Sequence, residues 1–126
     1  MLATILKRWN SQAQKTGSQL LVTSVTTPPQ LWPNTAERKQ EAVKHKLNWM
    51  QPEETLAALL ERDAIPYLPL APEMQQLTDQ GELIAHGFAG QKPGPGYGHW
   101  NREGHKAAAS VLARKLCSLD LPLING

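Results

Sequence analysis

Residues 94–116 read GPGYGHWNREGHKAAASVLARKL and contain the side chains best suited to chemistry. A glycine-rich loop leads to His99 directly before a predicted helix. Asn101 stands at the N-cap position, where its side-chain oxygen can accept a hydrogen bond from an early helix N–H. A loop fixed by a helix at this point holds an imidazole as a general base requires. The alternative role for His99 is structural, as a capping or packing residue at the helix entrance.

The pattern HWNxxGH, followed by an alanine-rich helix, resembles the C-terminal block of the SGNH (GDSL-type) hydrolases. Upstream, GSQLLVTSVTTPPQLWP is similar to a strand and loop of that family, LLERDAIPYLPLAPEMQQL to a later helix–strand segment, and LIAHGFAG to the approach to the last helix. The resemblance covers nearly all 126 residues, but only the C-terminal part of a family member. It implies a serine esterase or acyltransferase on a three-layer α/β/α sandwich, and it puts the general base on His99.

Two catalytic features of that family are absent from this sequence. It contains no Gly-Asp-Ser, no GxSxG and no Gly-x-Asn-Asp, so both the nucleophile and the oxyanion-hole blocks are missing. Ser24 alone lies near the end of a predicted strand, and nothing beside it supplies an oxyanion hole. Tyr97 and Gly96 occupy the positions where the family has an Asp, so a backbone carbonyl or water has to orient His99. The serines are Ser11, Ser18, Ser24, Ser110 and Ser118.

Other residues around His99 are expected to be structural. Gly104 is predicted to allow close packing, and Trp100 to pack under the loop, with contact to a substrate as the alternative. His105 is expected to be neutral and hydrogen-bonded, because the start of a helix disfavours a cation. His86, His99 and His105 lack both an i, i+4 spacing and an HExxH pattern, so neither a metal site nor a cofactor is predicted.

Apolar spacing and turn residues divide the chain into helices, strands and loops. Leu2, Ile5, Leu6 and Trp9 mark an amphipathic helix, and Thr35 is a candidate N-cap of the next one. Two prolines in IPYLPL indicate the edge or the end of a strand. Helices are predicted over residues 2–15, 35–47, 53–63, 72–80 and 102–117, strands over 19–25 and 65–70, and loops over 28–33 and 87–98.

Strands separated by helical crossovers predict an α/β fold in which helices pack on a parallel sheet. With the resemblance, the expected architecture is a partial three-layer α/β/α sandwich with a small, flavodoxin-like parallel sheet. Two strands are few for this many helices, since a parallel sheet needs both faces covered. We therefore expect residues 1–126 to be a single, incomplete SGNH-hydrolase-like C-terminal region, marginally stable and with exposed apolar surface.

Charge and composition restrict the partners. Residues 1–50 carry seven Lys/Arg and two Glu, which leaves nucleic-acid binding as an alternative. The aromatic residues are not interleaved with these cations in a known RNA- or DNA-binding pattern, so solvated helix faces and no nucleic-acid partner are expected. No run approaches the roughly 20 apolar residues of a membrane helix. Cys117 is the only cysteine, which favours a reducing compartment, cytoplasmic by default, although relatives are exported or membrane-anchored.

The sequence therefore predicts the base-bearing part of an acyl hydrolase. His99 would take and return the proton in attack on an ester or acyl carbonyl. Without a nucleophile, the chain alone is expected to be inactive. The expected partners are an ester or acyl substrate, a small molecule or a glycan, in the full-length relative, and the missing N-terminal part. The alternative is a non-catalytic α/β interaction module.

Overall fold

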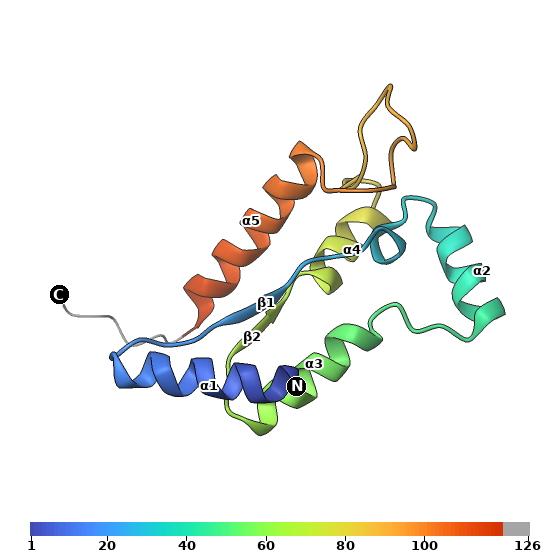
Figure 1. Ribbon diagram of the computed structural model, residues 1–126. Helices are drawn as coiled ribbons and strands as arrows, with labels where there is room; N and C mark the ends of the chain where they lie inside the picture. The colour runs from blue at the N-terminus through green and yellow to red at the C-terminus, as the bar shows by residue number, and fades with distance from the viewer. Residues whose placement is uncertain (120–126) are drawn as a thin grey trace.

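The computed structural model describes residues 1–119 and shows helices around a small parallel sheet (Figure 1). This order confirms the predicted α/β alternation of helices and strands. A 3-10 helix, η1, replaces part of the predicted loop after the first strand. The elements are α1 (Leu2–Lys15), β1 (Val22–Ser24), η1 (Pro28–Leu31), α2 (Thr35–His45), α3 (Gln51–Arg62), β2 (Tyr67–Pro69), α4 (Ala71–Asp79) and α5 (Arg102–Ser118).

Strands β1 and β2 run parallel, with Val22 opposite Tyr67 and Thr23 opposite Leu68. The long connection that parallel pairing requires is formed by η1, α2 and α3. Both strands are shorter than predicted. Pro66 and Pro69 lack the backbone N–H that would extend the hydrogen-bond ladder between the strands, and Pro69 is the last residue of β2.

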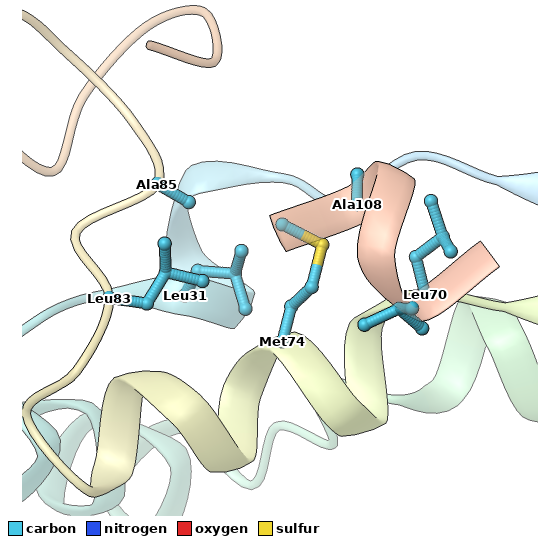
Figure 2. Close-up of a cluster of buried hydrophobic side chains, with 7 residues drawn as sticks. Leu31, Leu70, Met74, Leu83, Ala85 and Ala108 are labelled. Carbon is cyan, nitrogen blue, oxygen red and sulfur yellow. The ribbon is translucent and has the colours of Figure 1, made fainter. Parts of the chain in front are cut away.

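Two hydrophobic clusters hold the helices to the sheet. Alternating strand residues point to opposite faces, and Val22 and Tyr67 pack with α1 and α3 in one cluster. In the other, Met74 of α4 reaches toward Ala108 of α5, beside Leu31 (Figure 2). The first cluster has Leu6, Leu60 and Ile65 at its centre; the second has Leu31, Leu70, Met74, Leu83, Ala85, Ala108 and Val111.

Helix α1 has the predicted bounds, but it buries less of its apolar face than the spacing suggests. Only Leu6 is buried, whereas Leu2, Ile5 and Trp9 are 55%, 39% and 60% exposed. The reason is geometric: the first cluster meets α1 along the narrow line on which Leu6 lies. Within residues 1–119, no helix is both long enough and apolar enough to cross a membrane.

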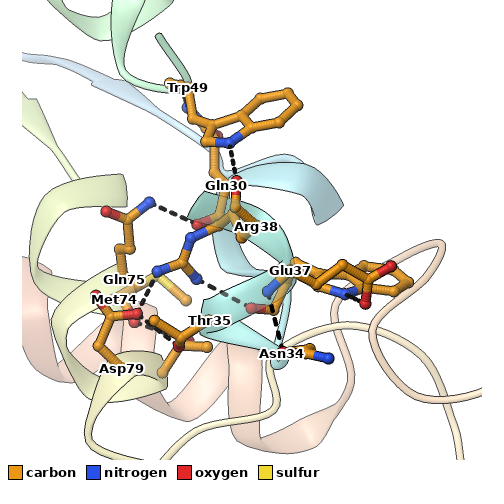
Figure 3. Close-up of polar contacts among 11 residues, drawn as sticks. Gln30, Asn34, Thr35, Glu37, Arg38, Trp49, Met74, Gln75 and Asp79 are labelled. Carbon is orange, nitrogen blue, oxygen red and sulfur yellow. Dashed lines mark hydrogen bonds and ion pairs between the residues drawn. The ribbon is translucent and has the colours of Figure 1, made fainter. Parts of the chain in front are cut away.

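Helix α2 is fixed by a polar network rather than by an apolar stripe (Figure 3). Its buried Arg38 forms an ion pair with Asp79 of α4 and donates a hydrogen bond to the Trp32 carbonyl. The prediction of Thr35 as N-cap is wrong, because Asn34 caps the helix by accepting from the Glu37 N–H at 3.1 Å. The Thr35 hydroxyl instead donates to Asp79.

Candidate functional site

His99 lies in the last part of the glycine-rich loop, exposed to solvent, three residues before the start of α5 at Arg102. Its backbone is fixed by a short antiparallel pairing between the two ends of this loop. His86 and Trp100 form the bridge, and the Gly87 N–H donates to the His99 carbonyl at 3.0 Å. The loop therefore closes on itself and presents His99 from a constrained backbone.

Asn101 joins this loop to α5, as predicted. Its side-chain oxygen accepts a hydrogen bond from the Gly104 N–H at 2.9 Å, which is the expected N-cap. Its amide nitrogen also donates to the carbonyls of Ile84 at 2.7 Å and Gly87 at 3.0 Å. One side chain thus caps the helix and ties its start to the segment that enters the His99 loop.

Gly104 allows the close approach that the sequence predicted. A Cβ atom built on Gly104 would lie 2.3 Å from the carbonyl oxygen of Ala85, far inside van der Waals contact. The first turn of α5 consequently rests directly on the backbone of the segment that precedes His86. A side chain at this position would push the helix away from the loop.

A buried hydrogen-bond relay connects this loop to the residue that follows β1 by two positions. The Trp100 indole N–H donates to the Thr26 hydroxyl at 2.7 Å. The Thr26 oxygen lies 3.3 Å from Nε2 of His86, and Nδ1 of His86 lies 2.8 Å from the Gly98 carbonyl. The relay therefore fixes the residues on both sides of His99.

The partners of His86 define its protonation state. A carbonyl only accepts, so Nδ1 carries the proton, and Nε2 is free to accept from the Thr26 hydroxyl. Burial lowers the pKa of His86 below its ordinary value of 6.5; the hydrogen bond to Gly98 opposes this shift and the nearby His99 adds to it. His86 is thus held as a neutral imidazole with a fixed tautomer.

His99 faces a cavity of about 490 Å³ beyond the carboxyl end of β1. In α/β folds this end of the strands is where ligands bind. Thr26 and Thr27 form one side of the cavity, and both hydroxyls already have hydrogen-bond partners. The described lining contains no Ser, Asp or Glu and consists of Val25, Thr26, Thr27, Pro28, His86, Gly98, His99, Trp100 and His105.

Ser24 is outside this cavity. Its hydroxyl lies 2.6 Å from the phenol oxygen of Tyr67 on the neighbouring strand. Burial raises the pKa of Tyr67, the hydrogen bond with Ser24 opposes the rise, and the charge of Glu53 adds to it. A neutral phenol cannot act as the base for Ser24, so this pair is a structural contact between β1 and β2.

Two further imidazoles lie close to His86. Among the described residues no side-chain hydrogen bond involves the His99 ring, whereas His86 lies 2.8 Å from the Gly98 carbonyl, so the expectation that a carbonyl or water orients His99 stays a prediction. His105 is exposed, and its ring packs edge-on against the Trp100 ring with 5.5 Å between the ring centroids. The expectation that His105 is neutral and hydrogen-bonded stays a prediction.

Sequence analysis missed the roles of His86 and Thr26. His86 follows the apolar run Leu83–Ala85 directly, which is a signal for a buried polar residue that needs partners. Three imidazoles line the same cavity, but residues 1–119 contain no group of three or more His, Cys, Asp or Glu side chains arranged to hold a metal ion.

The site is thus a fixed loop that presents His99 beside a cavity at the carboxyl edge of a parallel sheet, and the exposed His105 of α5 lines the same cavity. Comparison with protein-family models, with curated proteins and with solved structures finds no match to this chain.

Proposed function

We propose that this chain supplies the general base of a serine-type acyl hydrolase of the SGNH kind, with His99 in that role. The observation that carries the proposal is the exposed His99 imidazole beside a cavity at the carboxyl end of β1. Asn101, Gly104 and the His86 relay support it, because they constrain the backbone from which His99 projects. A general base needs this constraint more than it needs burial.

In the proposed reaction, His99 takes the proton of a serine hydroxyl as the oxygen attacks an ester or acyl carbonyl. The same imidazole then returns the proton to the leaving oxygen as the tetrahedral intermediate breaks down. The sequence has neither the Gly-Asp-Ser block of the nucleophile nor the blocks of the oxyanion hole, so the proposal gives this chain the general base alone. In this proposal the two strands belong to a three-layer, flavodoxin-like sheet, and the substrate is a small ester or an acylated glycan.

The test combines the genomic sequence upstream of Met1 with an assay of ester hydrolysis. We expect in-frame coding sequence upstream of Met1 to contain a Gly-Asp-Ser block. The product of that longer frame should hydrolyse p-nitrophenyl acetate, and His99→Ala should abolish turnover. His45→Ala, which removes an exposed imidazole on α2, is the matched control and should keep it. The absence of the block, or turnover that survives His99→Ala, would overturn the proposal.

A second candidate function is a non-catalytic interaction module. The observation that favours it is the cavity lining, in which the described residues offer neither a serine nor a carboxylate to His99. This candidate predicts that upstream sequence lacks Gly-Asp-Ser and that the 126-residue chain folds and is functional without further sequence. The same genomic observation therefore separates the two functions.

A further inference from the structure

A larger cavity lies on the other side of η1, between the start of α1, the α2–α3 connection and the length of α3. Its volume is about 840 Å³, within the range of small-molecule sites. We call this cavity the groove. Thr27 lines both the groove and the His99 cavity. The groove is lined by Leu2, Thr27, Pro29, Gln30, Lys46, Leu47, Asn48, Trp49, Gln51, Pro52, Thr55, Leu56, Ala58, Leu59 and Arg62.

The floor of the groove is apolar. Leu56 and Leu59 of α3 form it, and Leu47 and Trp49 of the α2–α3 connection form one end. Leu47 is 44% exposed although it is a large apolar residue. The free energy falls when an apolar chain replaces water on a surface of this kind.

The charged side chains in the described lining of the groove are both positive. Lys46 and Arg62 line it, and its described lining contains no Asp or Glu. Arg62 lies 3.7 Å from Asp63, which is also paired with Lys7 at 3.0 Å. Lys46 makes no ion pair with any residue of the described chain, so its charge is the one available to a ligand.

The two cations lie near opposite ends of the groove. Helix α3 has 12 residues, a length of about 18 Å. Lys46 precedes this helix and Arg62 is its last residue. Residues from Gln51 to Arg62 line the groove, so its α3 wall is about as long as an extended alkyl chain.

We propose that this groove binds a single-chain anionic amphiphile of the fatty-acid class, as a monomer. Its alkyl chain lies along Leu56 and Leu59, and its carboxylate lies at Lys46. The charge complementarity and the concave shape favour this ligand over a membrane surface, which would instead contact the exposed Trp9 outside the groove. The inference concerns a site separate from His99 and does not depend on acyl hydrolysis.

The first test titrates sodium dodecanoate into the purified chain by calorimetry, below the micelle concentration and at pH 8. We expect saturable binding of one ligand per chain. Ala58→Trp fills the groove from an exposed position of α3 and should weaken binding at least tenfold. Ala109→Trp makes the same change at an exposed position of α5 outside the groove and should leave binding unchanged.

The second test concerns the charge. Lys46→Glu removes the attraction and adds a repulsion, so dodecanoate should bind roughly three- to tenfold more weakly. Lys92→Glu makes the same charge change in the exposed glycine-rich loop, outside the groove, and is the control. An equal loss in both variants would reduce the effect to net charge and overturn the placement of the carboxylate.

Two further outcomes would overturn the proposal. One is the absence of saturable dodecanoate binding by a chain whose circular dichroism shows it to be folded. The other is binding to vesicles of anionic phospholipid, sensitive to Trp9→Ala, without binding of monomeric dodecanoate. His99→Ala should leave dodecanoate binding unchanged, so failure of the acyl-hydrolase proposal and failure of the groove are distinguishable.

Discussion

At the level of single side chains, His86 couples the stability of the His99 loop to pH. Burial, the first cause, lowers its pKa in the folded state, so the unfolded chain takes up a proton first as pH falls below 6.5. The contribution of His86 to folding is therefore complete above pH 6.5 and is lost progressively below it. A protonated Nε2 would also present a donor to the Thr26 hydroxyl in place of an acceptor.

We expect the urea midpoint of the chain to be lower at pH 5 than at pH 7.5, and His86→Gln to reduce this difference. Contacts with Lys115 lower the pKa of Glu73 below its ordinary value of 4.5. For Asp79, burial raises the pKa, but the contacts with Arg38 and Thr35 outweigh burial and lower it below 3.8. Protonation of these two carboxyls therefore reduces the stability of the fold only below those ordinary values. His45→Gln, at an exposed position, should retain the wild-type difference. An equal pH dependence in both variants would contradict the role of His86.

Gly104 carries a second residue-level prediction. Alanine favours a helix over glycine by about 1 kcal/mol, but its Cβ would lie 2.3 Å from the Ala85 carbonyl oxygen. The clash with backbone outweighs the propensity, so Gly104→Ala should lower the free energy of unfolding by about 1–3 kcal/mol. Thermal denaturation measures it, with the exposed Ser110→Ala of α5 as a near-neutral control. A stabilised Gly104→Ala would show that α5 can move away from the loop.

At the level of elements, the start of α5 depends more strongly on its capping side chain, Asn101, than the start of α2 depends on Asn34. Asn34 caps α2 through a single accepted hydrogen bond, whereas Asn101 caps α5 and also donates to Ile84 and Gly87. Losing a cap costs about 1 kcal/mol, and each orphaned hydrogen bond adds about 1 kcal/mol.

Asn101→Ala should therefore destabilise the chain by about 2–4 kcal/mol, and Asn34→Ala by about 1 kcal/mol. Urea denaturation followed by circular dichroism compares the same substitution at two caps. Equal losses would mean that the two donated bonds of Asn101 add nothing to the stability of the loop.

The sequence predicts the elements well where the signal is local. Apolar spacing and the Asn101 cap place α1 and α5 within a residue or two of their bounds. The strand predicted over residues 19–25 is longer than β1, because Pro66 and Pro69 limit the hydrogen-bond ladder with β2. The contact between Thr26 and His86 joins residues that are 60 positions apart, and no local pattern encodes it.

At the level of the whole molecule, the uneven charge of the sequence is partly an internal feature. Residues 1–50 have an excess of positive charge and residues 51–126 an excess of negative charge. Lys7 pairs with Asp63, and the buried Arg38 pairs with Asp79, so ion pairs connect the two halves. Part of the basic character of the first half is thus used within the fold, while Lys46 remains available to a ligand.

At the same scale, the core formed by residues 1–119 is divided into two small clusters, which makes each large buried side chain important. Leu60 is 1% exposed and lies at the centre of the cluster that holds α1 and α3 to the sheet. Its truncation to alanine should cost about 2–5 kcal/mol, a large part of the roughly 5–15 kcal/mol that stabilises a whole domain.

Leu60→Ala should therefore lower the free energy of unfolding by about 2–5 kcal/mol, measured by urea denaturation with circular dichroism. Leu47→Ala removes the same atoms from a 44% exposed site in the groove and should cost under about 1 kcal/mol. Alternate strand residues point to opposite faces, so loss of the Leu60 cluster should expose the face of the sheet on which Val22 and Tyr67 lie. Equal, small losses in both variants would mean that α1 and α3 contribute little to holding the molecule together.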